Sequence, residues 1–304
     1  MNTYNAFDEF IKEHIPADRI FEDEPMKNHT TFRVGGNADR FVEINDESEL
    51  AEVVKYLKMT GNDFFVLGNG SNLLVSDDGY RGVVLHIGNG MSKITITDTT
   101  VKAGAGALLS TVARKACGEG LTGMEFASGI PGSIGGAMVM NAGAYGGEMG
   151  MITDRVKVVT YDGEILNLDN KSMDFKYRES SVKNRPFVVL EATFKLEKGD
   201  VNEISAKVKE LDEKRRAKQP LEYPSAGSTF KRPEGHFAGK LIMDTGLRGY
   251  RIGGAQVSEK HCGFVINMGN ATAADIYELM QEISEKVYDK FDVKLEPEVV
   301  RLGF

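Results

Sequence analysis

Residues 123–148 form a glycine-rich stretch that could bind a ligand through its main chain. The stretch reads GMEFASGIPGSIGGAMVMNAGAYGGE and holds eight of the 34 glycines of the chain. Glycine loses much backbone entropy on folding, so such a run suits places where φ is positive or where something approaches the main chain closely. Residues 129–137 predict a turn that opens into a short helix, whose free N–H groups would face an anion such as a diphosphate. A tightly packed structural turn is the alternative.

Two further groups of residues could meet an anion. A second small-residue loop, GNGSNLL at residues 68–74, has donors of its own. The end of a predicted helix over residues 201–218 is rich in cations, and two more follow it: Lys214, Arg215, Arg216, Lys218, Lys231 and Arg232. These cations form either an anion site or a solvated helix end whose charges suit the helix dipole. The glycine stretch itself contains neither a Walker motif nor Gly-x-Gly-x-x-Gly.

The composition describes a globular chain without a broad positive field. Its 304 residues are enough for two or three domains, and its formal net charge is −8. This charge argues against a general nucleic-acid or membrane-surface binder, so an anionic ligand needs a local cation cluster. The acidic N-terminus has no signal-peptide run and no segment resembles a membrane span, so a cytoplasmic protein is expected. Cys117 and Cys262 are interpreted as small buried hydrophobes rather than disulfide or metal ligands.

Hydrophobic periodicity in the first third predicts a βαβ-type unit. The expected elements are a helical lead-in within residues 1–25, a strand that ends at Ile44, a helix that follows a capping box at residues 46–49 and stops at Gly61, and a buried strand at residues 64–67.

The remaining two thirds alternate strands with helices. Strands are expected at residues 83–87, 94–101, 156–160, 165–168, 188–194, 263–267 and 293–302, with a hairpin turn at Asp162-Gly163. Helices are expected at residues 108–117, at residues 201–218 before Pro220, and from a capping box at residues 272–275 to about residue 289. No repeat or low-complexity segment is present.

Six motifs, in this order, resemble one enzyme family. They are TTFRVGG (30–36), LGNGSNL (67–73), GIPGSIGG (129–136), YRESS (177–181), AGSTFK (226–231) and LEPEV (295–299). Together they are similar to UDP-N-acetylenolpyruvoylglucosamine reductase (UDP-N-acetylmuramate dehydrogenase), the FAD- and NADPH-dependent oxidoreductase of peptidoglycan precursor synthesis, and thus of cell-wall biogenesis, cell shape and division. The resemblance runs from about residue 20 to the C-terminus.

The resemblance implies an α+β fold. Its parts are a two-subdomain FAD-binding module of the vanillyl-alcohol-oxidase (PCMH) type, at residues 1–95 and 96–200, and a C-terminal α/β substrate-binding domain at residues 201–304. The last strand, near residues 293–302, would return to the active site. The family has a kind with an inserted tyrosine-bearing loop over the substrate diphosphate and a kind without it. This chain shows no such insertion and resembles the second kind, which leaves open what holds that diphosphate.

The reaction that the resemblance implies turns UDP-N-acetylglucosamine enolpyruvate into UDP-N-acetylmuramate. NADPH gives a hydride to the flavin, leaves, and is replaced by the sugar nucleotide, whose C3 receives the hydride. The carbanionic charge at C2 spreads into the carboxylate, so the site must stabilise an enolate and supply one proton. No readable motif distinguishes NADPH from NADH.

Three residues match the family positions for this chemistry. Ser228 matches the proton donor, although a serine hydroxyl alone is most often a turn residue. Arg178 matches the arginine that holds the substrate carboxylate, a task that suits a permanently charged fork; otherwise it would be a surface ion-pair partner. Glu298 matches the acid opposite, with Glu296 as runner-up. Strand alternation puts Leu295, Pro297 and Val299 on one face and both glutamates on the other, so it cannot separate them.

The binding residues are carried over from the same motifs. FAD, held non-covalently, would have its diphosphate between the two small-residue loops, and Arg215 would lie near its pyrimidine. The expected flavin contacts are Gly68, Asn69, Gly70, Ser71, Asn72, Leu73, Gly129, Ile130, Pro131, Gly132, Ser133, Gly135, Gly136 and Arg215. The expected contacts to substrate, or in turn to NADPH, are Tyr177, Lys218, Lys231, Arg232, Gln256, Ser258 and Asn267. The chain is expected to act as a monomer without a metal.

Two other functions compete with the reductase. An oxidase of the same fold would often attach its flavin through His or Cys, but His29, His86 and Cys117 lie in no recognisable attachment motif. A non-catalytic sugar-nucleotide binding protein would need the glycine loops alone and would leave the three catalytic residues without a use.

Overall fold

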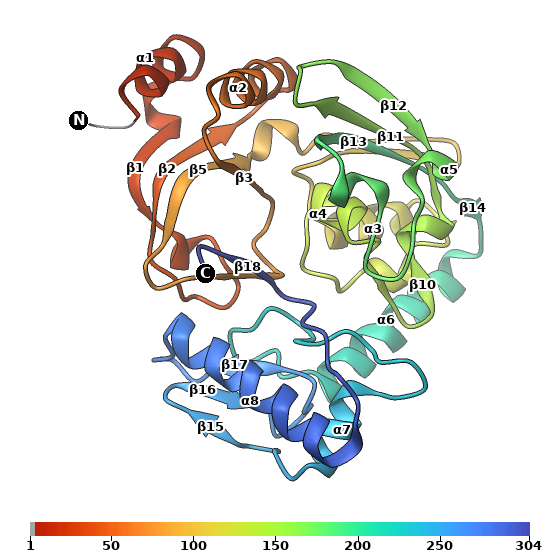
Figure 1. The fold of residues 1–304 in the computed structure, drawn as a ribbon. Coiled ribbons are helices and arrows are strands. Elements are labelled where there is room, and N and C mark those ends of the chain that lie inside the picture. Colours follow the sequence, from red (N-terminus) through yellow and green to blue (C-terminus); the bar gives the residue numbers. More distant parts are fainter. Residues whose placement is uncertain (1–3) are drawn as a thin grey trace. The chain divides into compact units, whose positions relative to one another are not determined.

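The computed structural model describes residues 4–304, which divide into two compact units. The first unit consists of the described residues up to 22 together with residues 40–69 and 82–213. The second unit consists of residues 23–39, 70–81 and 214–304, so two early segments of the chain belong with its C-terminal part. Figure 1 shows the elements of the chain, coloured along the sequence and labelled where there is room. No helix in the described part of the chain is long and apolar enough to cross a membrane.

A five-stranded antiparallel sheet is the centre of the first unit. Its order is β12-β11-β13-β7-β6. The strands are β6 (Ile94–Thr97), β7 (Thr100–Gly104), β11 (Thr153–Thr160), β12 (Ile165–Asp169) and β13 (Phe187–Lys195). The single strand expected at residues 94–101 is wrong, because the chain reverses at Asp98, whose φ is 52°. The hairpin predicted at Asp162-Gly163 is confirmed by the pairing of β11 with β12.

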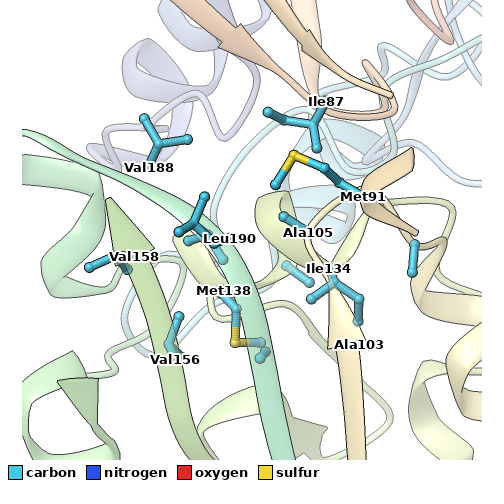
Figure 2. Close-up of a cluster of buried hydrophobic side chains, with 14 of the residues drawn as sticks. Ile87, Met91, Ala103, Ala105, Ile134, Met138, Val156, Val158, Val188 and Leu190 are labelled. Carbon is cyan, nitrogen blue, oxygen red and sulfur yellow. The ribbon is translucent and has the colours of Figure 1, made fainter. Parts of the chain in front are cut away.

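A helix of the first unit packs against this sheet. This helix, α4 (Ile134–Val139), contacts β13 and β7, while α3 (Leu109–Gly118) contributes buried residues to the same hydrophobic core. In Figure 2, Ile134 and Met138 of α4 lie among Ala103, Ala105 and Leu190 of the sheet region. α4 comes this close because Gly135 has no side chain: a Cβ there would lie 3.3 Å from the Ala105 Cβ.

The predicted βαβ elements are present, with one strand more than expected. α1 (Asn5–His14) is followed by β1 (Ile20–Pro25), so the helical lead-in ends earlier than residue 25. β1, β2 (Asn37–Ile44), β5 (Tyr80–Ile87) and β3 (Phe64–Leu67) form a sheet in this order. α2 (Glu47–Thr60) begins at the N-cap Asp46 and ends at Gly61, as predicted. The side chain of Glu49, however, accepts from the Asn45 N–H rather than from the cap residue.

The second unit has its own core and its own strands. β15 (Arg251–Ile252), β16 (Ala255–Val257) and β17 (Val265–Asn267) form an antiparallel sheet, and β4 (Leu73–Val75) pairs in parallel with β18 (Val300–Leu302). The strand expected over residues 293–302 is wrong in extent, since β18 covers only its end. α7 (Ala238–Asp244) was not predicted, because a helix this short has little periodicity. α6 (Val201–Lys218), which continues from the first unit, has the predicted bounds.

Short elements complete the chain. They are β8 (Leu121–Thr122), β9 (Gly143–Ala144), β10 (Gly147–Glu148), α5 (Asn170–Met173) and β14 (Glu197–Lys198). The expected burial of both cysteines is confirmed, with Cys117 and Cys262 each 6% exposed. Burial raises the pKa of the Cys117 thiol to about 11, so this cysteine is an unreactive core residue at neutral pH.

α8 (Ala273–Phe291) begins at a doubly capped N-terminus. Thr272 and Asp275 form the predicted capping box. Asp77 adds two bonds from a distant segment of the same unit: its carboxylate accepts from the N–H groups of Ala273 at 2.9 Å and Ala274 at 2.8 Å. Asp77 thereby ties residues 70–81 to the longest helix of the second unit.

We expect the D77A substitution to lower the free energy of unfolding by about 1–2 kcal/mol, because two helix N–H groups lose their acceptor. Urea denaturation of the FAD-saturated protein measures the change. The matched control is D78A, whose neighbouring exposed carboxylate lies outside the α8 cap; equal destabilisation by both substitutions would contradict the assignment.

Candidate active site

The two small-residue loops meet within the first unit at Gly68 and Asn69. The Asn69 side-chain amide donates to the Pro131 carbonyl oxygen. A Cβ on Gly68 would lie 2.2 Å from the Ser133 Oγ, so a larger residue would displace that hydroxyl from the Gly136 N–H. Glycine at position 68 therefore suits the close approach of residues 131–133, and the predicted proximity of the two loops is observed for this part.

The amides at the start of α4 are not free to bind an anion, which corrects the interpretation made from the sequence. The N–H groups of Ile134 and Gly135 donate to the carbonyls of Ala107 and Ala105, each at 2.8 Å. The Gly136 N–H donates to Ser133 Oγ at 3.4 Å. The predicted turn and short helix are confirmed, but hydrogen bonds to residues 105–107 satisfy the helix end. Other groups of the loops must meet a diphosphate.

The rest of the first loop, from Gly70 to Leu73, belongs to the second unit. Gly70 has φ 57°, and a Cβ there would lie 1.9 Å from the His29 carbonyl oxygen. The next residues lead into β4, where Leu73 pairs with Val300 of β18. This loop is therefore also a structural partner of the C-terminal strand, a second role that the sequence did not indicate.

Asn72 connects this loop with the residue expected to act as the catalytic acid. Its side-chain amide donates to the Glu298 carbonyl oxygen at 3.1 Å. Its own carbonyl accepts from the Val300 N–H at 3.0 Å. Two hydrogen bonds thus fix the main chain on either side of Val299.

Ser228 lies between a left-handed glycine and a firmly held threonine. Gly227 has φ 76°. Thr229 is 1% exposed; its N–H donates to the Gly263 carbonyl at 2.8 Å, and its Oγ1 accepts from the Val265 N–H at 2.9 Å. Ser228 itself is exposed. The segment is therefore anchored while the hydroxyl group of Ser228 stays accessible to a ligand.

A short antiparallel pairing places Glu298 beside this segment. The Glu298 N–H donates to the Thr229 carbonyl at 2.9 Å, and the Lys231 N–H donates to the Glu296 carbonyl at 2.8 Å. Ser228 directly precedes Thr229, and Glu298 bonds to Thr229. Both residues thus lie on one small framework of the second unit.

The two glutamates that the sequence could not separate differ in the structure. Glu296 is exposed, its carboxylate lies 2.9 Å from the Lys231 Nζ, and a hydrogen bond from that ammonium lowers the pKa of the carboxyl group. Glu298 is half-buried. The expected alternation also fails at Pro297, which is exposed while Leu295 and Val299 are buried, because only a single bridge joins this segment to Phe230.

Arg178 lies in the first unit, at the tip of a tight turn. The Lys176 N–H donates to the Glu179 carbonyl at 2.9 Å, which closes the turn. Arg178 has φ 57°, a conformation that is uncommon outside glycine and that often marks a functional site. Its guanidinium donates to the Gly143 carbonyl at 3.4 Å and lies 4.9 Å from the centre of the Tyr177 ring.

The expected substrate contacts fall into two groups. Gln256, Ser258 and Asn267 are buried, and their side chains bond to main-chain groups. Gln256 donates to Gly249, and Ser258 accepts from Lys260 and His261. Asn267 accepts from Gly269 and Ala271 and donates to the carbonyl of the distant Phe32. Lys218 and Arg232 are exposed, and Arg232 lies 4.0 Å from the Phe237 ring centre. The exposed cations are the better placed to reach a dissolved ligand.

One polar atom that the sequence analysis passed over fits a bound cofactor. The Gln219 Oε1 is the buried side-chain oxygen that has no hydrogen-bond donor anywhere in the described part of the chain. Burying such an atom is unfavourable unless a ligand or an ordered water supplies the donor. Gln219 lies four residues after Arg215, which is expected near the flavin pyrimidine, so its place in the sequence was the available signal.

His261 is a second residue that the sequence analysis did not single out. Its Nδ1 accepts from the Gly263 N–H at 3.1 Å, next to the strand that holds Thr229. Burial, and to a smaller extent the charge of Lys218, lowers the pKa of His261 below its ordinary value of 6.5. The imidazole is therefore neutral at pH 7 and can serve as an acceptor.

We expect the protein to lose stability as the pH falls below about 6.5, because the unfolded histidine gains a proton before the folded one does. H261N keeps an acceptor near Gly263 and removes the titration, so its urea midpoint should change less between pH 7.5 and pH 5.5 than that of the unaltered chain. Parallel changes in both proteins would show that other groups dominate.

Comparisons with known proteins agree over nearly the whole chain. Residues 38–169 match the family model of an FAD binding domain, and residues 219–302 match that of the UDP-N-acetylenolpyruvoylglucosamine reductase C-terminal domain. The UDP-N-acetylenolpyruvoylglucosamine reductase of Agathobacter rectalis is 51% identical, with 98% of each chain covered. That of Clostridium tetani is 48% identical over 100% of this chain and 98% of its own.

A solved structure supports the same assignment. The crystal structure of UDP-N-acetylenolpyruvylglucosamine reductase from Thermus caldophilus is 34% identical, has a TM-score of 0.80, and covers 93% of this chain and 98% of that chain. The expected fold class, an FAD-binding module followed by the C-terminal domain of this family, is confirmed, and so is FAD as the cofactor. The chain belongs to the UDP-N-acetylenolpyruvoylglucosamine reductase family.

Proposed function

We propose that this chain reduces UDP-N-acetylglucosamine enolpyruvate to UDP-N-acetylmuramate for peptidoglycan synthesis, with NADPH as the electron donor. The observation that carries the proposal is the 51% identity, over 98% of both chains, to a protein named for this reductase activity. The oxidase and the non-catalytic binding protein have no comparable support. A cytoplasmic monomer and the division at residues 95 and 200 are parts of the same proposal.

Arg178 is the residue proposed to hold the substrate carboxylate. FAD, when bound, supplies the hydride chemistry between NADPH and the C3 atom of the enolpyruvyl group. Charge then builds up at C2 and in the carboxylate, where a fixed, permanently charged guanidinium stabilises the enolate. The turn of Arg178, with its left-handed backbone and its bond to Gly143, restricts the guanidinium before the substrate arrives.

Ser228 is the proposed proton donor to C2, and Glu298 the acid that orients the reacting group. The exposed hydroxyl of Ser228 sits on an anchored main chain, which limits the motion that a proton transfer would otherwise require. Glu298 is preferred to Glu296 because it matches the family position for this acid and is half-buried, whereas Glu296 is exposed.

The remaining assignments are weighed by their contacts. Residues 68–73 and 129–136 are proposed to surround the FAD diphosphate without using the amides at the start of α4. Arg215, joined by Gln219, is proposed to meet the flavin pyrimidine. Tyr177, Lys218, Lys231 and Arg232 are proposed to contact the sugar nucleotide or NADPH, whereas Gln256, Ser258 and Asn267 act there only if they exchange their present hydrogen bonds.

The overall activity can be tested in one cuvette. Purified protein should show flavin bands that bleach anaerobically with NADPH and return when the UDP-linked enolpyruvyl sugar is added. A colourless protein that takes up no FAD would remove the reductase proposal. Reoxidation by oxygen alone would support the oxidase instead.

We expect S228A to separate the two half-reactions. NADPH should still bleach the flavin, while reoxidation by the enolpyruvyl substrate should slow by about 10²–10⁴-fold, because a positioned proton donor is lost. Stopped-flow absorbance measures both rates. The matched control is S225A. The main-chain carbonyl of Ser225, rather than its side chain, accepts from the Thr31 hydroxyl, so the substitution keeps this contact. Unchanged reoxidation in S228A would remove Ser228 from the mechanism.

We also expect the two glutamates to differ in kinetics. E298Q should reduce kcat by at least about 10²-fold, whereas E296Q should retain most of kcat, because its carboxylate only pairs with Lys231. Steady-state rates with saturating NADPH provide the comparison. A larger loss in E296Q than in E298Q would reverse the assignment.

A further inference from the structure

We propose that Asn141 is a positioning residue for Arg178, and that it acts through the main chain of the turn that carries this arginine. The inference rests on the proposed role of Arg178 and names a residue that the six sequence motifs did not include. All of its contacts lie within the first unit.

Asn141 is a buried amide whose side chain is fully engaged. It is 0% exposed. Its Nδ2 donates to the Lys176 carbonyl at 3.1 Å, and its Oδ1 accepts from the Gly150 N–H at 2.8 Å. The Lys176 carbonyl also receives the Glu179 N–H, at 3.2 Å, which closes the turn around Tyr177 and Arg178. Asn141 therefore bonds to Lys176, the first residue of the turn that carries Arg178.

The segment that contains Asn141 contacts the turn at two further points. The Ser180 Oγ, in a residue that is 1% exposed, donates to the Val139 carbonyl at 3.0 Å. The Arg178 guanidinium donates to the Gly143 carbonyl at 3.4 Å. Residues 139–143 thus hold the base of the turn, the residue that follows it and the guanidinium itself.

The backbone at both ends of this connection is in the left-handed region. Asn141 has φ 42° and Arg178 has φ 57°. Asparagine tolerates this region better than most residues, and an arginine stays there only if its surroundings hold it. The side-chain bonds of Asn141 and Ser180 supply such a restraint.

Residues 139–143 follow closely after residues 129–136, which are proposed to contact FAD. α4 starts after Ser133 and ends at Val139, and it is fixed on the sheet by Ile134 and Met138 (Figure 2). α4 therefore connects residues 129–133 with residues 139–143, which hold Arg178. A change in this connection would move Arg178 relative to residues 129–133 although the arginine side chain itself is unaltered.

The test is a double-mutant cycle with N141G and R178A. Glycine keeps the left-handed backbone and removes both side-chain bonds. We expect N141G to slow flavin reoxidation by the enolpyruvyl substrate by about 10- to 100-fold, since a displacement of about 1 Å can reduce a rate by about 10²-fold. The KM for the enolpyruvyl substrate should rise as well. Flavin reduction by NADPH should be unchanged. In the R178A background, N141G should have no further effect on reoxidation.

The matched control is N170A. Asn170 also gives two side-chain amide bonds to this region, to the carbonyls of Gly150 at 2.7 Å and Thr153 at 2.8 Å, but none to residues 176–179. N170A should leave both half-reactions at their original rates. If N141G does not fold, S180A tests the same restraint and should slow reoxidation in the same direction.

The outcomes are distinct. Equal slowing by N141G with and without Arg178 would show a general structural role and overturn the inference. Normal reoxidation in both N141G and S180A would also overturn it, even if R178A is inactive, and would leave the proposed role of Arg178 intact. Normal reoxidation in R178A itself would remove Arg178 from the mechanism and the inference with it.

Discussion

The pairing of residues 229–231 with residues 296–298 is the contact on which the second unit's part of the site depends. Only two main-chain bonds make it, Glu298 to Thr229 and Lys231 to Glu296. The two paired segments come from distant parts of the chain, and each is held by a further partner: residues 263–265 on one side and Asn72 on the other. The exposed hydroxyl of Ser228 and the half-buried carboxylate of Glu298 are the groups that this framework carries.

The first unit solves a different problem, which is to hold a long, flexible side chain. A guanidinium has many rotamers, so a rigid backbone alone would not fix it. Arg178 is instead presented by a closed turn, bonded to the Gly143 carbonyl and placed over Tyr177. Two buried side chains hold that turn: Asn141 donates to the Lys176 carbonyl, and Ser180 donates to the Val139 carbonyl. In the proposed mechanism these polar contacts orient the arginine.

Local signals in the sequence were enough for much of the fold. The N-cap of α2, the capping box of α8, the hairpin at Asp162-Gly163 and the turn that leads into α4 depend on neighbouring residues, and each was predicted correctly. The prediction that the amides at the start of α4 are free was wrong, because Ala105 and Ala107, which accept from them, come from another part of the chain. The alternation of residues 295–299 differs at Pro297, where a single bridge to Phe230 leaves the residue exposed.

The site shows the same division between local pattern and distant contact. The motifs identified the family, but alternation could not choose between Glu296 and Glu298, whereas their burial differs: Glu296 is exposed and Glu298 is half-buried. A buried amide such as that of Asn141 has no sequence signature of its own. Gln219 lies near Arg215 in the sequence, but the missing donor to its oxygen becomes visible only when the atoms around it are known.

The framework of Ser228 and Glu298 also has a consequence for how freely this enzyme can change. Main-chain N–H and C=O groups are the same in every residue other than proline, so the bonds between the two segments do not specify the side chains of residues 231 or 296. Substitutions there can alter surface charge or fit to a new ligand while the proposed catalytic groups keep their places. Variation under selection, including selection by an inhibitor, therefore has more room beside these groups than at Gly68, where an added Cβ would displace the Ser133 hydroxyl.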